Sequence, residues 1–522
     1  MPVKSVQKRL EISGKALKAL QKRIKKRKLN DGDYELIQGM AETIECLNQA
    51  LAEKDTSIGR LCKYLLGAPT ETARNLFKQK KQPKENNQLQ PREKIKGHGR
   101  NRSGEYKNPD RVTIGHPILT SGNLCPGCEK GKVYELALPS VFVHITGSAP
   151  LNATVYERTR LRCNLCGEVY TPKLPVDVGD KKYDDSAAAM LALLKYGCGL
   201  PLHRIEKLQA NLGTPVPSST QWDILNATAL TLAPVHDTLI CHAAQGEIIH
   251  NDDTTMKVLS LLKEQDPDST RKGIFTSGIV SKSKEYQIAL FMTGNRHAGE
   301  NLTQVLKNRE TGLAPPIQMC DALSRNKSKE FQTIMTNCMS HARRKFAELV
   351  DRFPDDCAYV IEKLGTVYHH DAITKEQGMS ARDRLSYHQA HSSPVMAELH
   401  QWCEKQIDAK IVEPNSGLGE AISYMLKHWK KLTGFLEIAG APLDNNICER
   451  ALKYAILHRK NSLFYKTQRG AHVGDLFMSL IHTCQLAGIN PLDYLTWLMK
   501  NIKDLETSPE DYMPWNYRKS SD

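Results

Sequence analysis

Apolar side chains recur at heptad spacing between residues 37 and 65. One heptad position holds Ile37, Ile44, Leu51, Ile58 and Leu65, and the other holds Met40, Leu47 and Leu61, with Lys54 as the single break. Four such heptads predict a helix within residues 31–77 that pairs with a second copy of itself. We therefore expect a homodimer or a higher homo-oligomer, although a helix packed on its own domain would give the same pattern.

Three β-prone runs occur at residues 246–262, 273–280 and 286–292, and their succession predicts an antiparallel meander. A helix is predicted over 298–306, and a short strand over 316–320 leads to Asp321. The first run is interrupted by residues 251–254, which include the pair Asp252 and Asp253. Successive strand residues point to opposite faces, so only one of this pair can face a given site, and the pattern does not choose between them.

Helical periodicity dominates residues 184–232, within the region 179–240, and residues 328–427. In the first region, a helix over 202–212, a break at Gly213 and Pro215, and a second helix capped by Ser218 or Ser219 have the outline of a helix-turn-helix. The second helix would then contact DNA. An ordinary helical hairpin would have the same outline.

The net charge of +14 is concentrated in two segments. Residues 1–30 carry 11 Lys and Arg against the single acid Glu11, and residues 78–115 form a polar, basic linker. Such segments attract phosphate and favour a nucleic-acid partner, although solvated tails would look the same. No run approaches the roughly 18 apolar residues of a membrane span. We therefore predict an intracellular, soluble protein without a membrane partner.

Two Cys-x-x-Cys pairs are separated by a β-prone spacer. They consist of Cys125 with Cys128 and of Cys163 with Cys166. Each pair offers two thiolates on one tight turn, and two such turns can close a tetrahedral Zn²⁺ site. The alternative, a redox dithiol, gives no role to the second pair. A zinc-binding β unit is predicted within residues 116–178.

A third acid, Glu449, shares a helix face with Leu452 and Ile456, in a helix for which Asp444 is a plausible N-cap. A helix docked on the sheet through this face would bring Glu449 to the strand carboxylates. Together, such acids can hold two divalent cations, Mg²⁺ or Mn²⁺, for phosphodiester chemistry. The basic residues that follow are suited to binding phosphates.

These blocks together resemble the transposases of the insertion sequence 66 family. The resemblance rests on both cysteine pairs and on RLCKYLLG (60–67), KGHGR (96–100), LLKYGCGLPLHR (193–204), CMSHARRKF (338–346), DNNICER (444–450) and RKN (459–461). The family implies a catalytic triad of Asp252, Asp321 and Glu449, and so selects Asp252 over Asp253. One departure follows Asp321, where this chain has ALSRN (322–326) and the family usually has glycine and tyrosine.

The implied fold is a multidomain α+β chain with a ribonuclease H-like α/β catalytic domain. Its predicted parts are a basic arm (1–30), a coiled-coil helix (31–77), a flexible linker (78–115), a zinc-binding unit (116–178), a helix-turn-helix region (179–240), the catalytic domain (241–335 and 430–502), a helical insertion (336–429) and a C-terminal tail (503–522).

The implied function is that of a DDE transposase that cleaves element ends and transfers them to target DNA. Its partners would be double-stranded DNA, as element ends and as target, and possible accessory proteins. It would act in the bacterial cytoplasm, associated with the nucleoid. The expected DNA contacts are Lys96, His98, Arg100, Arg102, Arg343, Arg344, Arg450, Arg459 and Lys460. The alternatives are a non-catalytic zinc and helix-turn-helix regulator, or a metal-dependent nuclease of the same fold.

Overall fold

A computed structural model describes residues 20, 23–24, 29–40, 113, 117–136, 147–162, 164–166, 168–175, 178, 181–264 and 273–517. They belong to two compact units, which are described separately. The first combines Met1–Pro83 with Arg343–Thr366, and the second combines Lys84–Ala342 with Val367–Asp522.

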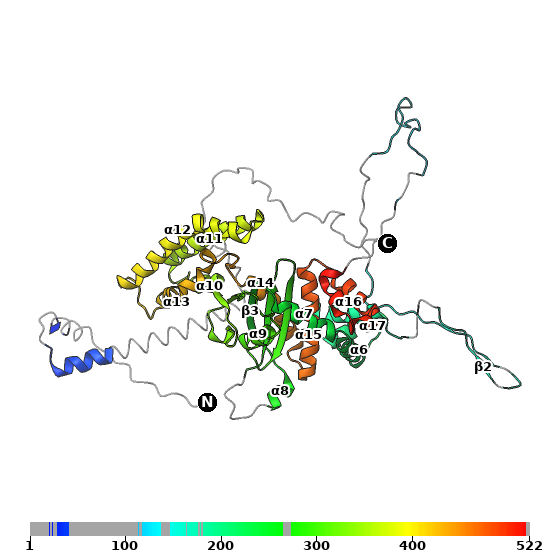
Figure 1. Ribbon diagram of the computed structural model, residues 1–522, viewed down its shortest axis with the longest axis horizontal. Helices are drawn as coiled ribbons and strands as arrows, with labels where there is room; N and C mark the ends of the chain where they lie inside the picture. The colour runs from blue at the N-terminus through cyan, green and yellow to red at the C-terminus, as the bar shows by residue number, and fades with distance from the viewer. Residues whose placement is uncertain are drawn as a thin grey trace. The chain divides into compact units, whose positions relative to one another are not determined.

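The second unit is built around a mixed five-stranded sheet (Figure 1). Its strands are β3 (Ile248–Thr255), β4 (Phe275–Lys282), β5 (Gln287–Gly294), β6 (Ile317–Cys320) and β7 (Ile334–Asn337), in the order β5-β4-β3-β6-β7. The first three strands are antiparallel, and β6 and β7 run parallel to β3. The predicted meander is therefore confirmed, within a mixed α/β fold.

Two strand boundaries differ from the prediction. The first run does not continue to residue 262, because β3 ends at Thr255 and residues Leu259–Glu264 form helix α8, which buries Leu261. Between them, Val258 forms an isolated parallel bridge with Tyr465, which draws the chain away from the sheet. The predicted helical stretch from residue 328 instead begins with strand β7, which pairs with β6.

Helices cover both faces of the sheet. On one face α14 (Asn446–Ser462) contacts β3 and β4, and on the other α7 (Ala233–Ala244) and α9 (Ala298–Leu306) pack against the same sheet. Gly278 on β4 allows the close approach of α14, since a Cβ there would lie 2.9 Å from the Cδ2 atom of Leu452. The predicted docking face of this helix is therefore confirmed, with Leu452 buried.

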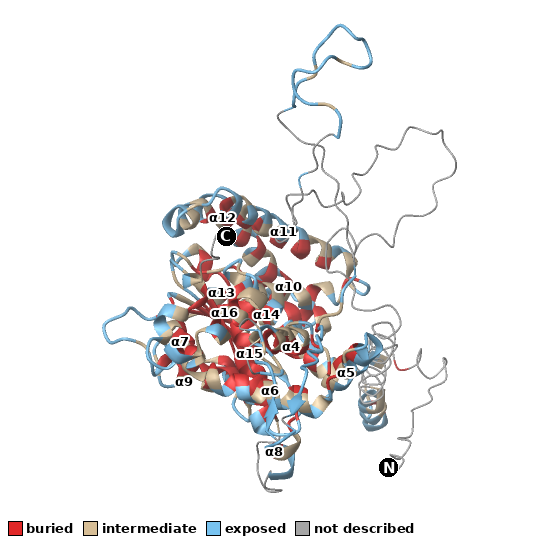
Figure 2. Ribbon diagram, turned by 90° about the vertical axis from the view of Figure 1, so that its right-hand side faces the viewer, coloured by how far each residue is buried: buried red, intermediate tan, exposed pale blue. Residues whose placement is uncertain are grey.

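Helix α15 (Gln468–Leu486) runs beside the edge strand β5. Three of its side chains, spaced four residues apart, accept hydrogen bonds from the strand: Asp475 from the amide of Thr293, Ser479 from that of Phe291, and Thr483 from that of Ala289. They satisfy backbone donors that an open edge would expose. Figure 2 shows the buried residues concentrated in α15 and the neighbouring elements.

The predicted helical hairpin forms as α5 (Leu202–Asn211) and α6 (Ser218–Thr231), but its cap differs. The N-cap position of α6 is Pro217 rather than a serine. Glu206, on α5, accepts hydrogen bonds from the amide of Ser218 at 3.1 Å and from the Ser218 hydroxyl. These bonds lower the pKa of Glu206. A carboxylate from the neighbouring helix α5 thus caps α6. The residue spacing within α6 alone could not indicate this cap.

Other helices complete the second unit. They are α4 (Asp185–Ala192), which continues as a π-helical turn (Leu193–Gly197), α16 (Pro491–Lys500) and α17 (Ile502–Leu505), with 3₁₀ turns at Ser324–Asn326, Gly434–Leu436, Pro509–Tyr512 and Pro514–Asn516. The predicted insertion contains α10 (Met339–Ala347), α11 (Pro354–Glu376), α12 (Ala381–Asp408) and α13 (Gly417–Leu432). Asp371 ties α11 to α12 through an ion pair of 2.7 Å with Arg384.

In the first unit, residues 31–40 are helical. Asn30 and Asp33 each accept the other's backbone amide, which caps the helix start, and Asp33 pairs with Arg23 at 2.7 Å. Most of the predicted coiled coil, the greater part of the basic arm and almost all of the linker lie outside the described residues.

Among the described helices, none is by itself long and apolar enough to cross a membrane. Helices α6 and α7 meet the length and composition criteria only as a pair, bent by 55°.

Candidate active site

Asp252 lies near the end of β3, directly opposite Gly278 on β4. One of its carboxylate oxygens accepts hydrogen bonds from the amide of Asp253 at 2.8 Å and from the Asn326 side chain at 3.3 Å. Its strand neighbours of like parity, His250 and Thr254, contact α14 through Asn445 and Arg459. By strand alternation Asp252 therefore points to the α14 face of the sheet.

Asp253 points to the opposite face. Its side chain is only 1% exposed, and its carboxylate contacts the ring of His297 at 3.0 Å and the guanidinium of Arg325 at 3.4 Å. The structure thus separates the two acids that the sequence pattern left as alternatives. Asp253 is held by two basic side chains, while Asp252 faces the other acids.

Asp321 follows β6, which pairs directly with β3, so the two strands bring Asp321 beside Asp252. Its Oδ1 accepts the amide of Leu323 at 3.0 Å and the side-chain amide of Asn326 at 2.6 Å. The same Asn326 nitrogen also reaches Asp252, so one amide group links both carboxylates.

Asn326 was not identified from the sequence. It belongs to the segment after Asp321 that departs from the family pattern, and only the 3₁₀ turn at Ser324–Asn326 folds it back over the acids. The residue is buried, and its side-chain oxygen has no hydrogen-bond partner within the described part of the chain. Its amide donors thus stand between two carboxylates, where a cation would be favourable.

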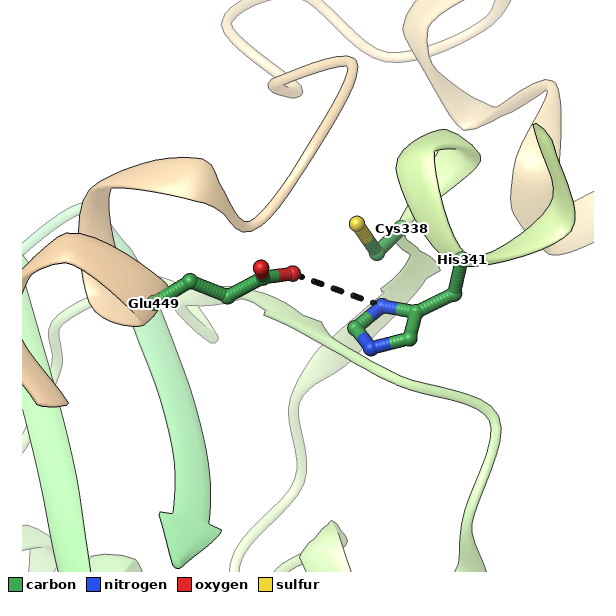
Figure 3. Close-up of side chains that lie close together, drawn as sticks. All are labelled: Cys338, His341 and Glu449. Atoms are coloured by element: carbon green, nitrogen blue, oxygen red, sulfur yellow. Dashed lines mark ion pairs between the residues drawn. The ribbon is translucent and has the colours of Figure 1, made fainter. Parts of the chain in front are cut away.

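Glu449 lies in the first turn of α14. Figure 3 shows its carboxylate directed toward the ring of His341, with an Oε1 to Nδ1 distance of 3.7 Å, and Cys338 beside them. In the described residues, the three predicted acids do not bring their ligand atoms within 4.8 Å of one another. Asp252 and Asp321 are thus joined through Asn326, and Glu449 adjoins them but is turned toward His341.

The pKa of Asp252 reflects both its burial and the nearby acids. Burial raises the pKa of Asp252 to about 7, and the charges of Asp321, Asp253 and Glu449 add to the effect, against the hydrogen bond from the Asp253 amide. A buried carboxylate near like charges gains most from a divalent cation. The donor set is all oxygen, which is what Mg²⁺ and Mn²⁺ prefer. These residues therefore fit such a metal, with a side-chain rotation of Glu449.

The predicted DNA contacts have different surroundings. Arg459 donates to the hydroxyls of Thr254 and Thr255 at 3.0 and 2.7 Å, so it holds the end of β3. Arg450 and Lys460 are exposed on α14. Arg343 and Arg344 are half-buried on α10. The linker residues Lys96, His98, Arg100 and Arg102 lie outside the described residues.

The first cysteine pair forms a tight turn. The amide of Cys125 bonds to the carbonyl of Gly131 at 2.7 Å, and the Cys128 sulfur accepts the Gly131 amide at 3.5 Å. Hydrogen bonds from the backbone of Lys130 and Gly131, then from Cys125, lower the pKa of Cys128, as suits a metal thiolate. Cys166 lies between β1 (Leu161–Arg162) and β2 (Val169–Tyr170). Cys163 is outside the described residues.

A cavity of about 610 Å³ lies between α7, β5 and α15. It is lined by polar side chains such as His236, Arg469 and Asp475, but by none of the three acids. The cavity is therefore separate from the three acids.

Replacement of Gly299 by alanine is expected to disturb the site without touching an acid. A Cβ at Gly299 would lie 2.2 Å from the carbonyl oxygen of Lys327 and 2.7 Å from that of Arg325, the residues on either side of Asn326. We expect a loss of about 1–3 kcal/mol in the free energy of unfolding and weaker metal binding. Urea denaturation and Mn²⁺ titration measure both. Gly365→Ala is the control, because its Cβ would meet nothing within 4 Å. Equal effects of the two substitutions would contradict this expectation.

Comparisons with known proteins identify the family to which this chain is similar. The family model described as "Transposase IS66 family" matches residues 181–473, more than half of the chain, a range that includes all three acids. Two similar proteins come from Sinorhizobium fredii (strain NBRC 101917 / NGR234). "Uncharacterized protein y4jD" is 27% identical over 69% of this chain and 72% of its own length. "Uncharacterized protein y4hP" is 26% identical over 79% and 77%.

Proposed function

Because the chain belongs to the IS66 transposase family, we propose that it is a DDE transposase that binds the ends of an insertion sequence, cleaves them and joins them to target DNA. The observation that carries the proposal is the linkage of Asp252 to Asp321 through Asn326, beside Glu449. A DNA-processing enzyme of this family is expected to use a divalent metal, and these acids are the candidate ligands.

The proposed catalytic domain is ribonuclease H-like and spans residues 241–335 and 430–502, with the insertion 336–429 between its second and third acids. Support comes from the mixed sheet, in which the central strand β3 carries Asp252 and its parallel neighbour β6 leads to Asp321. The helix that bears Glu449 packs on the same face as Asp252.

Asp252 and Asp321, on two adjacent strands whose pairing fixes their separation, would hold divalent cations. Such cations would supply activation of the attacking oxygen and stabilisation of the leaving oxygen of the phosphodiester. Asn326, which donates to both carboxylates, would hold them together until a cation takes its place. Glu449 would be the third ligand. The same acids would serve first for the attack of water and then for that of the freed 3′ hydroxyl.

The regions outside the catalytic domain are proposed to bind DNA and a second subunit. Cys125, Cys128, Cys163 and Cys166 would hold Zn²⁺ within residues 116–178, and helix α6 of the 179–240 region would lie against DNA. The basic arm and linker would add salt-sensitive affinity. Pairing through residues 37–65 would hold two ends in one assembly, with accessory proteins as further partners.

The test uses labelled DNA that carries the terminal sequences flanking this gene, a target plasmid, and Mg²⁺ or Mn²⁺. A transposase yields cleaved ends and then covalently joined products on a denaturing gel. Cleavage without joining would identify a nuclease. Specific binding without cleavage at any metal concentration would identify a regulator, and either result would overturn the proposal.

A further inference from the structure

Cys338, His341 and Glu449 form a cluster of three different ligand types. Their sulfur, ring nitrogen and carboxylate oxygen all lie within 4.8 Å of one another, and no other such group of three or more occurs in the described residues. Figure 3 shows Cys338, directly before α10, and His341, on α10, on one side, and Glu449, on α14, on the other. We refer to these three residues as the thiol cluster.

The backbone around the thiol cluster holds the starts of both helices together. The amide of Cys338 bonds to the carbonyl of Cys320 at 3.0 Å, which continues the pairing of β7 with β6. The amide of Met339 bonds to the carbonyl of Leu443 at 3.2 Å, and the amide of Asn445 donates to the Cys338 sulfur at 3.2 Å. The ligand-bearing turns therefore have a fixed relation before any ligand binds, which lowers the cost of binding one.

We propose that the thiol cluster is a second metal site that takes a borderline-soft dication of the Zn²⁺ class and shares Glu449 with the proposed Mg²⁺ site. Thiolate, imidazole and one carboxylate are zinc ligands, and three protein ligands leave the fourth tetrahedral position open. Asp252 and Asp321 offer oxygen alone, which suits a harder cation. On binding, the Cys338 thiol loses its proton to solvent and the sulfur becomes the ligand.

Two features permit the cluster to close on an ion. Cys338 is 1% exposed, and the side chain of His341 is about a quarter exposed, so the cluster lies at the edge of the interior. The Nδ1 atom of His341 is itself buried, and it has no hydrogen-bond partner within the described residues. A metal would satisfy this buried nitrogen, which otherwise carries a desolvation cost.

The shared carboxylate has a functional consequence that rests on the proposed function. When Glu449 is held by an ion in the thiol cluster, it is withheld from Asp252 and Asp321. Low concentrations of Zn²⁺ should then inhibit strand cleavage, and excess Mg²⁺ should relieve the inhibition. The existence of the second metal site does not depend on this consequence.

The test measures zinc bound to the full-length protein. Parent, Cys338→Ser and His341→Gln proteins are equilibrated with the same series of free Zn²⁺ concentrations, and bound zinc per chain is counted by elemental analysis. We expect each variant to lose one equivalent, or to bind it roughly a hundredfold more weakly. Cys403→Ser, a buried cysteine on α12, is the matched control and should retain the parent stoichiometry. Because His341 is partly exposed, His341→Gln is expected to fold. It therefore tests the site even if the Cys338 variant misfolds.

Two further measurements make the outcome decisive. Co²⁺ bound to the parent should show a thiolate-to-cobalt absorption band whose intensity exceeds that of Cys338→Ser, because the cysteine pairs contribute equally to both proteins. Asp321→Asn should keep the extra equivalent of zinc. The proposal is overturned if both cluster variants bind zinc like the parent, or if Asp321→Asn loses the same equivalent. Because these readouts need no DNA, failure of the transposase proposal would leave them unchanged.

Discussion

Replacing Asp252 by asparagine is expected to lower the rate of strand cleavage by roughly a thousandfold or more, which corresponds to about 4 kcal/mol of transition-state stabilisation. Asp321→Asn and Glu449→Gln should have effects of similar size. Each change removes a negative ligand from one metal site while it keeps the shape of the side chain. Single-turnover cleavage of a labelled element end in Mg²⁺ measures the rates.

The adjacent acid provides the matched control for this prediction. Asp253 lies on the same strand but faces His297 and Arg325 on the opposite face of the sheet. Asp253→Asn should lower stability and leave the cleavage rate within about tenfold of the parent, as expected for the loss of a structural pair. An active Asp252→Asn protein together with an inactive Asp253→Asn protein would reverse the assignment.

The same Asp252→Asn change should stabilise the metal-free protein at alkaline pH. Burial, and then the neighbouring Asp321, raise the pKa of Asp252 to about 7 in the folded protein, above its ordinary value of 3.8. The ionised form is therefore disfavoured by folding. The stability that the protonated Asp252 carboxyl contributes is fully present below pH 4 and is lost as the pH rises through about 7. Asparagine does not ionise, so the Asp252→Asn protein does not lose this stability. Its melting temperature should exceed that of the parent by several degrees at pH 8.

Thermal denaturation at pH 8, 6 and 4 in the presence of a chelator measures this difference. The advantage of the variant should shrink as the pH falls and should disappear near pH 4. Added Mn²⁺ should raise the melting temperature of the parent and have little effect on the variant, because only the parent keeps the full ligand set. A variant that is less stable than the parent at pH 8 without metal would show that the Asp252 carboxylate is not electrostatically strained.

Local patterns in the sequence were sufficient for much of the sheet. The meander β3 to β5, the helix α9 and the strand before Asp321 follow from periodicity, because each is an apolar run of ordinary length. Strand β7 was missed because only two of its four residues, Ile334 and Met335, are apolar, whereas β6 has three apolar residues of four. The pleat of a strand predicts that Asp252 and Asp253 point to opposite faces of the sheet. Which of them faces the other acids depends on which helix packs on each face, and the sequence pattern does not give this.

The residues that surround the three acids could not be identified from periodicity or motif spacing in the sequence. Asn326 acts through a single 3₁₀ turn that folds it over two acids, and no spacing rule encodes that turn. Cys338 and His341 were recognised only as part of a longer motif. Their significance comes from the backbone hydrogen bond of Met339 to Leu443, which holds them near Glu449, more than a hundred positions away in the chain. The Glu206 cap of α6 has the same origin, since it depends on the neighbouring helix α5.

The most direct test is a crystal structure of the protein with Mn²⁺ and an element-end duplex, with the metal located by its anomalous scattering. We expect an anomalous peak at a ligand distance of roughly 2.0–2.2 Å from oxygens of Asp252, Asp321 and Glu449, with the Asn326 amide moved aside. A peak that lacks any one of these three carboxylates as a ligand, in a complex that cleaves its DNA, would contradict the proposed active site.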